Sequence, residues 1–156
     1  MPTVTFTAAD VADPAVSSLI AALSADLLQR YPDEVATPIV ADDFCAAAGY
    51  FALASIEGVP VGCGGFRVVS SDTVEIKRVF VLETQRGKGI SKGLLDHLET
   101  CATGRGFTHA ILETGTLQPE AIGLYRGRGY QQTPAFEPWV DNLFSVCFSK
   151  SLNPAS

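Results

Sequence analysis

Residues 79–91 read VFVLETQRGKGIS, and this stretch decides the fold of the chain. A run of antiparallel strands is expected to end in it, and alternating helices and strands are expected to follow it. Its first residues are apolar and strand-like, its middle is rich in glycine and basic side chains, and an apolar pattern with helical spacing follows it. We expect a strand, a glycine-rich turn and then a helix that ends near Gly104 or Gly106. Glycines allow the backbone to approach a ligand closely, and the N–H groups at a helix start attract anions. Arg86 and Lys88 add positive charge to this turn. The turn is therefore either an anion-binding site or an ordinary tight turn between a strand and a helix.

The glycine spacing in this turn does not match the common nucleotide-binding motifs. A Walker A loop needs a lysine followed by serine or threonine, but Lys88 is followed by Gly89, and no glycine stands five residues before Gly87. The dinucleotide pattern needs a third glycine three residues after Gly89, whereas the next one is Gly93. A nucleotide-phosphate binder is therefore disfavoured.

Before this stretch, the sequence predicts a strand, two helices and an antiparallel meander. Polar and apolar residues alternate over residues 3–7, and apolar residues recur at helical spacing over residues 14–31, with Asp10 or Asp13 as the cap. Pro32 ends this helix. A loop over residues 33–38 and a short second helix over residues 42–48 follow. The meander consists of three strands joined by turns at 57–58 and 70–72: residues 50–56, 61–69 and 73–82.

Behind the glycine-rich turn, helical and strand-like segments alternate. The expected elements are a helix from Ser91, a strand over 108–114, a helix from Pro119 that Gly129 closes, and two last strands over 130–136 and 143–149. The order β-α-α-β-β-β-α-β-α-β-β predicts a mixed α/β (α+β) fold with one strand–helix–strand crossover. The length of 156 residues, without a linker, predicts a single domain over residues 1–156.

The composition limits the classes of partner. Lys and Arg number 11 against 17 Asp and Glu, which gives a formal charge of −6 and a pI near 4.8. A nonspecific nucleic-acid binder needs a basic surface, so this balance predicts no nucleic-acid partner and is compatible with a cationic or amine-bearing one. No apolar run approaches the ~20 residues that span a bilayer, and the N-terminus lacks the pattern of a signal peptide. These features predict a cytoplasmic protein without a membrane partner.

The cysteines and histidines do not form a metal-binding pattern. No two cysteines pair in a C-x-x-C motif, and His97 and Cys101, one helical turn apart, have no second ligand pair, so we expect no metal. Cys63 and Cys147 stand in strand-like runs and are predicted to be buried apolar residues, while the other two cysteines lie in no nucleophile motif. His97 is expected on a solvated helix face and His109 at the start of a strand, both in structural roles.

A second segment, residues 118–130, reads QPEAIGLYRGRGY. Taken together with residues 79–91, it resembles the GNAT superfamily of N-acetyltransferases, enzymes that typically transfer an acetyl group from acetyl-CoA to an amine. The resemblance covers most of the chain, and its specific part is residues 74–130. It implies a GNAT-like acyl-CoA N-acyltransferase fold, in which helices flank a central, mixed and mostly antiparallel sheet. Acetyl-CoA would be the co-substrate.

The resemblance also implies which residues hold acetyl-CoA. The family's pyrophosphate loop, Arg/Gln-x-x-Gly-x-Gly/Ala, is matched except for a serine at the last position, and its backbone would hold the pyrophosphate: Arg86, Gly87, Lys88, Gly89, Ile90 and Ser91. The backbone of the preceding strand would pair with the pantetheine arm like an added strand: Val79, Phe80 and Val81. The later family motif is matched at Ala121, Leu124, Tyr125, Gly129 and Tyr130, with Gln118 where asparagine is common.

Acetyl transfer to an amine needs a base, a donor for the oxyanion and an acid for the leaving thiolate. The helical spacing alone favours a core tyrosine at position 125 with its hydroxyl satisfied. The match to the family motif reverses this preference and places Tyr125 near the CoA sulfur as the acid. Glu75 is the first candidate for the base, or else a solvated strand carboxylate near Lys77. Glu113 is the rival, as base or as an anchor for the amine. A backbone N–H on the splayed strand, near Val81, would stabilise the oxyanion.

The expected mechanism is direct attack of a primary amine on the thioester in a ternary complex, without an acyl-enzyme. The alternative is a non-catalytic acyl-CoA-binding sensor or interaction module, and CoA release in the presence of mixed amines separates the two.

The acceptor, a small-molecule or peptide amine, is left open by the sequence. Acidic residues expected on the acceptor side either favour a cationic amine or form a solvated surface: Asp33, Glu34, Asp42 and Asp43. Three aromatic residues near the C-terminus are either core or the wall of an acceptor pocket: Tyr130, Phe136 and Trp139. A homodimer through the last strands is compatible with the sequence.

Overall fold

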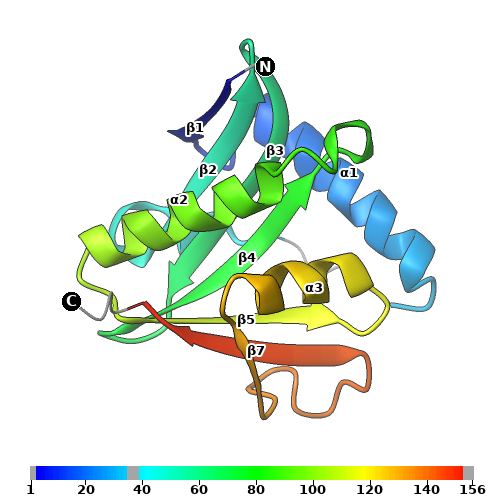
Figure 1. Cartoon of the computed structure of the whole chain (residues 1–156), viewed down its shortest axis with the longest axis vertical. Coiled ribbons are helices and arrows are strands. Elements are labelled where there is room, and N and C mark those ends of the chain that lie inside the picture. Colours follow the sequence, from blue (N-terminus) through cyan, green and yellow to red (C-terminus); the bar gives the residue numbers. More distant parts are fainter. Residues whose placement is uncertain (1–2, 35–38, 153–156) are drawn as a thin grey trace.

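A seven-stranded sheet forms the centre of the structure, in the strand order β1-β2-β3-β4-β5-β7-β6 (Figure 1). The structure is a computed structural model, which describes residues 3–34 and 39–152. The strands are β1 (Val4–Ala8), β2 (Gly49–Ile56), β3 (Val59–Val68), β4 (Thr73–Val81), β5 (His109–Gly115), β6 (Gln131–Thr133) and β7 (Ser145–Ser151). All neighbouring strands pair antiparallel except β4 and β5, which are parallel. The mixed, mostly antiparallel sheet that the sequence predicts is thus confirmed.

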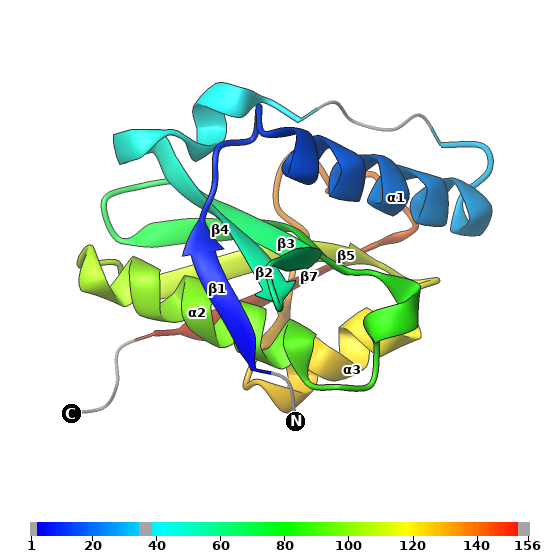
Figure 2. The same cartoon turned by 90° about the horizontal axis from the view of Figure 1, so that it is seen from above.

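Helices cover both faces of this sheet (Figure 2). Helix α1 (Pro14–Arg30) lies on one face, and α2 (Ile90–Gly104) and α3 (Pro119–Gly127) lie on the other. Helix α1 begins where the sequence places it, because the Asp13 side chain accepts a hydrogen bond from the backbone N–H of Ala15. None of the helices in residues 3–34 and 39–152 is long and apolar enough to cross a membrane.

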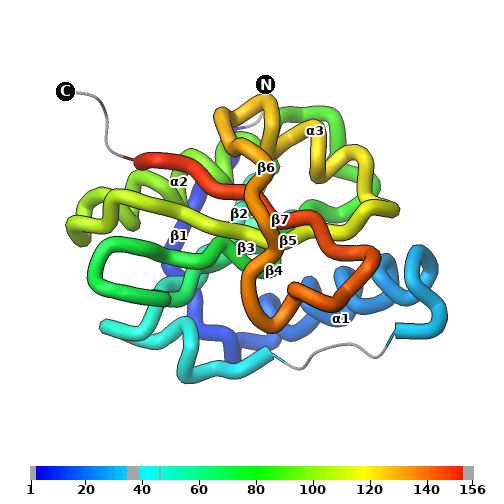
Figure 3. Tube along the Cα trace, turned by 90° about the horizontal axis from the view of Figure 1, so that it is seen from below, coloured from blue at the N-terminus to red at the C-terminus, as the bar shows by residue number. Residues whose placement is uncertain are grey.

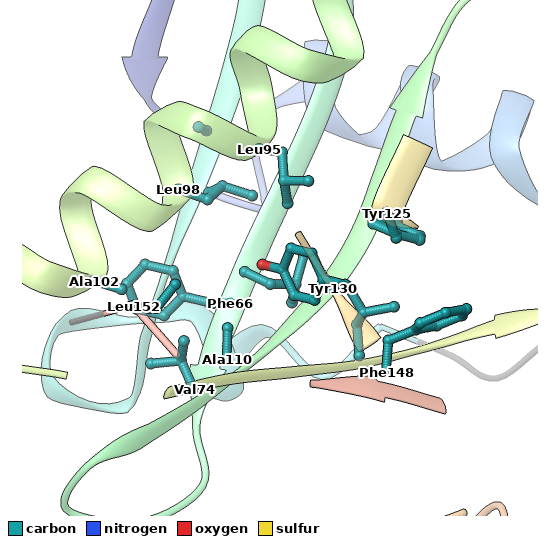
Figure 4. Close-up of a cluster of buried hydrophobic side chains, with 13 residues drawn as sticks. Phe66, Val74, Leu95, Leu98, Ala102, Ala110, Tyr125, Tyr130, Phe148 and Leu152 are labelled. Atoms are coloured by element: carbon teal, nitrogen blue, oxygen red, sulfur yellow. The ribbon is translucent and has the colours of Figure 1, made fainter. Parts of the chain in front are cut away.

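Apolar side chains fill the space on both sides of the sheet. One cluster lies between the sheet and the helices α2 and α3, and Figure 4 shows its side chains pointing toward one another from the helices and the strands. It includes Leu95 and Leu98 of α2, Tyr125 of α3 and Phe148 of β7. A second cluster lies beneath α1 and includes Leu23. The two clusters fix α1 and α3 on opposite faces of the sheet.

Strands β4 and β5 separate after a short paired region. They pair only where residues Thr73–Ile76 meet His109–Leu112. Beyond this point β4 continues beside β3 and β5 continues beside β7, and Figure 1 shows the two strands diverging. The register between β3 and β4 shifts at the same place, and Arg78 has a φ of 63°, as expected of a bulge that bends a strand. The sheet is therefore open between β4 and β5.

Most predicted elements occur within two residues of their expected bounds, with three differences. The expected second helix is a pair of 3₁₀ turns, η1 (Ala41–Phe44) and η2 (Ala46–Ala48), because Cys45 between them is extended. A further 3₁₀ turn, η3 (Glu83–Gln85), precedes the glycine-rich turn. Of the expected strand over 130–136, only β6 forms, since Pro134 follows it. Residues 35–38 of the expected loop lie outside the described residues.

The environment of His97 also differs from the sequence-based expectation of a solvated helix face. This prediction is wrong, because the imidazole is half-buried and stacks on the ring of Phe6 at a centroid distance of 5.6 Å. Its Nε2 lies 2.7 Å from the hydroxyl of Tyr50. Burial lowers the pKa of His97. The contact comes from strands β1 and β2, which local spacing within α2 cannot reveal.

Candidate active site

A cavity of about 430 Å³ lies where β4 and β5 separate. Its walls come from α1, β4, β5, α3 and the segment before β7. Leu23 of the cluster beneath α1 and Tyr125 of the cluster beneath α3 both line it, so the cavity passes through the sheet. Six of the residues that the sequence assigns to catalysis or to acetyl-CoA binding line this one cavity: Glu75, Val79, Glu113, Gln118, Ala121 and Tyr125.

The second half of β4 forms an open backbone edge beside this cavity. The Leu82 N–H donates to the Val61 carbonyl on β3 at 2.9 Å. Because neighbouring residues of a strand direct their backbone groups to opposite sides, the N–H and the carbonyl of Val81 point away from β3. The Val81 carbonyl accepts a hydrogen bond from Arg86 Nε at 3.0 Å on that side. This edge offers backbone groups to an extended ligand.

The glycine-rich turn follows β4 and leads into α2. Gly87 and Gly89 have φ values of 80° and 79°, the left-handed region that glycine adopts without strain. Within the described residues, no backbone N–H of residues 87–92 donates to a backbone carbonyl, and buried Ile90 anchors the start of α2. The turn therefore presents a row of free donors at the positive end of a helix, as an anion site requires. The cavity lining ends at Val79 and does not include this turn.

The side chains of the turn contribute less than its backbone. The guanidinium of Arg86 folds back over the ring of Phe80, at 5.5 Å from its centroid, and lies 3.9 Å from Asp26 of α1. Lys88 donates to the side-chain oxygen of Gln85 at 2.7 Å. Within the described residues, the Ser91 side chain makes no hydrogen bond, and the Ser91 N–H donates to no backbone carbonyl.

Glu113 lies on β5, where the sheet opens. Its Oε2 accepts a hydrogen bond from the Ser145 hydroxyl at 2.7 Å, and no cation of the described residues lies within ion-pair distance. Burial raises the pKa of Glu113 to about 7, an effect that the hydrogen bond from Ser145 and the charge of Lys77 only partly offset. The carboxyl group therefore changes its protonation state near neutral pH, as a general base should.

Glu75 lies on β4 in the same cavity but in a different electrostatic environment. Its side chain is almost fully buried, with a relative exposure of 3%. Arg67 donates to Oε1 at 2.8 Å, and Lys77 lies 3.6 Å from Oε2. Both oxygens are thus engaged by cations, so this carboxylate forms an internal ion cluster.

Tyr125 reaches the cavity from α3. The residue has a relative exposure of 7%, and its ring packs edge-on against Tyr130 at a centroid distance of 5.8 Å. Burial raises the pKa of Tyr125, and the nearby charge of Glu113 raises it further, so its hydroxyl stays protonated. The hydroxyl makes no hydrogen bond within the described residues. It is a proton donor in a cavity that Glu113 also lines.

Gln118 closes the turn between β5 and α3. Its Oε1 accepts a hydrogen bond from the Gly115 N–H at 3.1 Å and lies 3.4 Å from the hydroxyl of Tyr31. The Tyr31 hydroxyl also accepts from the Leu117 N–H at 3.0 Å, which ties the end of α1 to this turn. The amide oxygen of Gln118 thus has local partners, and its predicted contact with acetyl-CoA stays a prediction.

Sequence reasoning missed Tyr31, Phe144 and Ser145 and left Trp139 undecided. All four line the cavity. Figure 3 shows the segment between β6 and β7 reaching toward α1, and the rings of Tyr31 and Phe144 meet edge to face at 5.7 Å. Ser145 reaches Glu113 because β7 pairs with β5 in a register that places Ser145 opposite Gly115. No pattern within one segment reveals contacts between segments this far apart in the chain.

A family model described as the acetyltransferase (GNAT) family matches residues 17–130. The chain belongs to the GNAT family of acetyltransferases. It is 32% identical over 153 residues to a protein named IAA acetyltransferase from Azospirillum brasilense, an alignment that covers 97% of this chain and 100% of that protein. The GNAT-like fold and the membership of this enzyme class that the sequence predicts are therefore confirmed.

Solved structures of GNAT enzymes share this fold. A Klebsiella pneumoniae protein assigned to the acyl-CoA N-acyltransferases superposes with a TM-score of 0.81 at 32% identity, over 96% of this chain and 98% of that one. A GNAT family acetyltransferase from Elizabethkingia anophelis, solved with acetyl-CoA bound, superposes with a TM-score of 0.69 at 19% identity, over 95% of this chain and 97% of that one.

The residues of this GNAT enzyme fit acetyl-CoA, which the family uses. The free N–H groups of residues 87–92 suit a pyrophosphate, and the open edge of β4 suits an extended amide-bearing arm. In residues 3–34 and 39–152, no group of three or more His, Cys, Asp or Glu side chains could hold a metal ion. The expectation that catalysis needs no metal stays a prediction.

Proposed function

We propose that this GNAT enzyme transfers an acetyl group from acetyl-CoA to a primary amine, by direct attack in a ternary complex. The observation that carries the proposal is that Glu113 and Tyr125 meet in one cavity that passes through the sheet. A base and an acid in one cavity, beside an open strand edge, are what acetyl transfer requires. None of the four cysteines lines this cavity, which supports a mechanism without an acyl-cysteine.

Acetyl-CoA supplies an activated acyl group with a thiolate leaving group, and the chain positions it. In this proposal the N–H groups of residues 87–91 bind the pyrophosphate, and Val79, Phe80 and Val81 bind the pantetheine arm through their backbone. Ala121 lines the cavity on the α3 side, where it leaves room beside Tyr125. The Val81 N–H, which points away from β3, donates to the oxyanion.

Glu113 is the base in this proposal. An ammonium group with a pKa of ~10 has no lone pair, so a carboxylate must take its proton before the nitrogen attacks the acetyl carbon. The sequence ranks Glu75 first for this role. The contacts favour Glu113, because Arg67 and Lys77 engage both oxygens of Glu75, while Glu113 has a pKa raised to about 7. Glu75 then holds Lys77 in place at the cavity wall.

Tyr125 is the acid in this proposal. Glu113 passes the ammonium proton on to solvent before the attack. As the C–N bond forms and the C–S bond breaks, the second amine proton goes to Glu113 and the phenol proton goes to the leaving thiolate, after which solvent carries a proton from Glu113 back to the Tyr125 phenolate. Changing Tyr125 to Phe should lower kcat by about 10- to 1,000-fold, while the Kd for acetyl-CoA changes by less than about threefold. Steady-state kinetics and calorimetry measure the two effects. An unchanged kcat would remove Tyr125 from the acid role.

The first experiment is a calorimetric titration of the protein with acetyl-CoA, with ATP and NAD as control ligands, followed by an assay of CoA release with mixed primary amines. Binding of acetyl-CoA alone, with amine-dependent CoA release, is the expected result. Binding without CoA release would favour the alternative function, a non-catalytic acyl-CoA sensor. Absence of acetyl-CoA binding would contradict both functions. The single domain, the cytoplasmic location and a homodimer stay predictions from the sequence.

A further inference from the structure

We propose that the acceptor is a primary amine with a single positive charge, carried on an aromatic or similarly flat apolar body. The proposal rests on the proposed function and names the substrate class of the same cavity. It follows from the walls of the cavity on the α1 side of the sheet and from the charges that line it.

Flat apolar side chains form the walls at this end of the cavity. Tyr31 at the end of α1 and Phe144 before β7 meet edge to face, and Trp139 and Leu28 line the cavity beside them. Leu28 and Phe144 keep relative exposures of 58% and 46%. Large apolar side chains that stay exposed in a concave site mark a surface that a ligand covers. Aromatic rings gain additional stabilisation from stacked or edge-on packing against another ring.

The charges around the cavity suit one ammonium group and oppose a second. Two carboxyl groups that line the cavity have no cationic partner within the described residues, Glu113 and Glu34, whereas Glu75 already pairs with Arg67 and Lys77. Lys77 lines the cavity and shares the single negative charge of Glu75 with Arg67, so this group of three keeps a net positive charge that repels a second ammonium. Glu34 also lines it, but its side chain is exposed, where water and salt screen its charge.

A panel of primary amines tests the proposal with the full chain and acetyl-CoA. The probes are 2-phenylethylamine, butylamine as the apolar amine without a ring, 1,4-diaminobutane as the dication, and Nα-acetyl-lysine as a mimic of a protein amine. We expect kcat/KM for 2-phenylethylamine to exceed that for butylamine by about 10- to 200-fold, the range that apolar contacts supply in a binding pocket. The dication and Nα-acetyl-lysine should be poorer substrates than butylamine.

Two substitutions link this preference to the cavity walls. Phe144→Ala should reduce the ratio of kcat/KM between 2-phenylethylamine and butylamine by about tenfold. Lys77→Gln should raise kcat/KM for 1,4-diaminobutane relative to butylamine. The matched control is Val69→Ala, an exposed apolar residue in the turn before β4 and outside the cavity lining, which should leave both ratios unchanged.

Each other outcome overturns the inference in a way that can be told apart from failure of the proposed function. If 1,4-diaminobutane or Nα-acetyl-lysine equals 2-phenylethylamine in kcat/KM, the acceptor class is wrong although the acetyltransferase function stands. An unchanged ratio in the Phe144→Ala protein would show that these walls do not select the substrate. Acetyl-CoA binding without acetylation of any probe would overturn the inference, whereas absence of acetyl-CoA binding would overturn the proposed function itself.

Discussion

Glu113 titrates near neutral pH because of where the fold places it, not because of its neighbours in sequence. Its pKa rises to about 7 through burial at the opening of the sheet. If Glu113 is the base, kcat/KM should rise as pH increases through about 7, because only the ionised carboxylate accepts the amine proton. Glu113→Gln should remove the inflection near pH 7 and lower kcat/KM at pH 8 by about 100- to 10,000-fold. Initial rates of CoA release between pH 5.5 and 9 measure the effect.

The control for this experiment is Glu75→Gln, a change of the same type in the same cavity. It should keep the inflection near pH 7, although it frees Arg67 and Lys77 from their partner and costs activity through their displacement. If the inflection disappears in Glu75→Gln and persists in Glu113→Gln, then Glu75 is the base.

The same carboxyl group should make stability depend on pH. The folded protein keeps Glu113 protonated up to about pH 7, while the unfolded chain releases this proton near the ordinary value of 4.5. Stability is therefore lost as pH rises from about 4.5 to 7, and the loss is complete above 7. Glu113→Gln should raise the free energy of unfolding at pH 8, by up to about 3 kcal/mol, with little effect at pH 4. Urea unfolding at both pH values measures this, and a variant destabilised at pH 8 would contradict the raised pKa.

Among the elements, the glycine-rich turn has the strictest backbone requirement. Gly89 has a φ of 79°, and a Cβ placed on it would meet no atom within 4 Å. Gly89→Ala should therefore lower the free energy of unfolding through backbone strain alone, without a steric clash. We expect a loss of about 1–2 kcal/mol in the free energy of unfolding, together with weaker acetyl-CoA binding if the turn faces the pyrophosphate.

A second glycine provides the matched control. Gly123 is exposed in the middle of α3, where an added Cβ would meet no atom within 4 Å and the backbone φ is not left-handed. Gly123→Ala should therefore raise the free energy of unfolding by about 0.5–1 kcal/mol. Chemical denaturation of both variants, with calorimetry for acetyl-CoA, measures the contrast. A stabilised Gly89→Ala protein would show that this turn does not need its left-handed backbone.

At the scale of the whole molecule, the two halves of the sheet share only the short paired region between β4 and β5. Acetyl-CoA bound along the open edge should protect the backbone amides of Val81 and residues 87–92 from hydrogen exchange by at least about tenfold at saturation. Residues 73–76 already pair with β5 and serve as the internal control, with unchanged exchange. Hydrogen-exchange mass spectrometry with and without acetyl-CoA tests this, and protection confined to other segments would place the ligand elsewhere.

The order of elements could be predicted because their signals are local. The spacing of apolar residues and the Asp13 cap define α1, and Glu57 and Gly58 form the expected turn between β2 and β3 with φ values of 52° and 79°. The two segments that resemble the GNAT family lie on β4 with α2 and on α3, where the resemblance places them. Local signals gave a wrong prediction for the environment of His97, because that environment depends on Tyr50, which lies on a distant strand.

The sequence by itself determined the element order, the glycine-rich turn and the set of residues that could act in acetyl transfer, because dihedral preferences and apolar periodicity act over a few neighbouring residues. Only the tertiary structure distinguished the two carboxylates. Glu75 meets Arg67 across the pair β3 and β4, and Glu113 meets Ser145 across the pair β5 and β7. The apolar wall likewise forms only where Tyr31 and Phe144 meet. Burial and charge depend on contacts across the sheet, and those contacts exist only after the chain has folded.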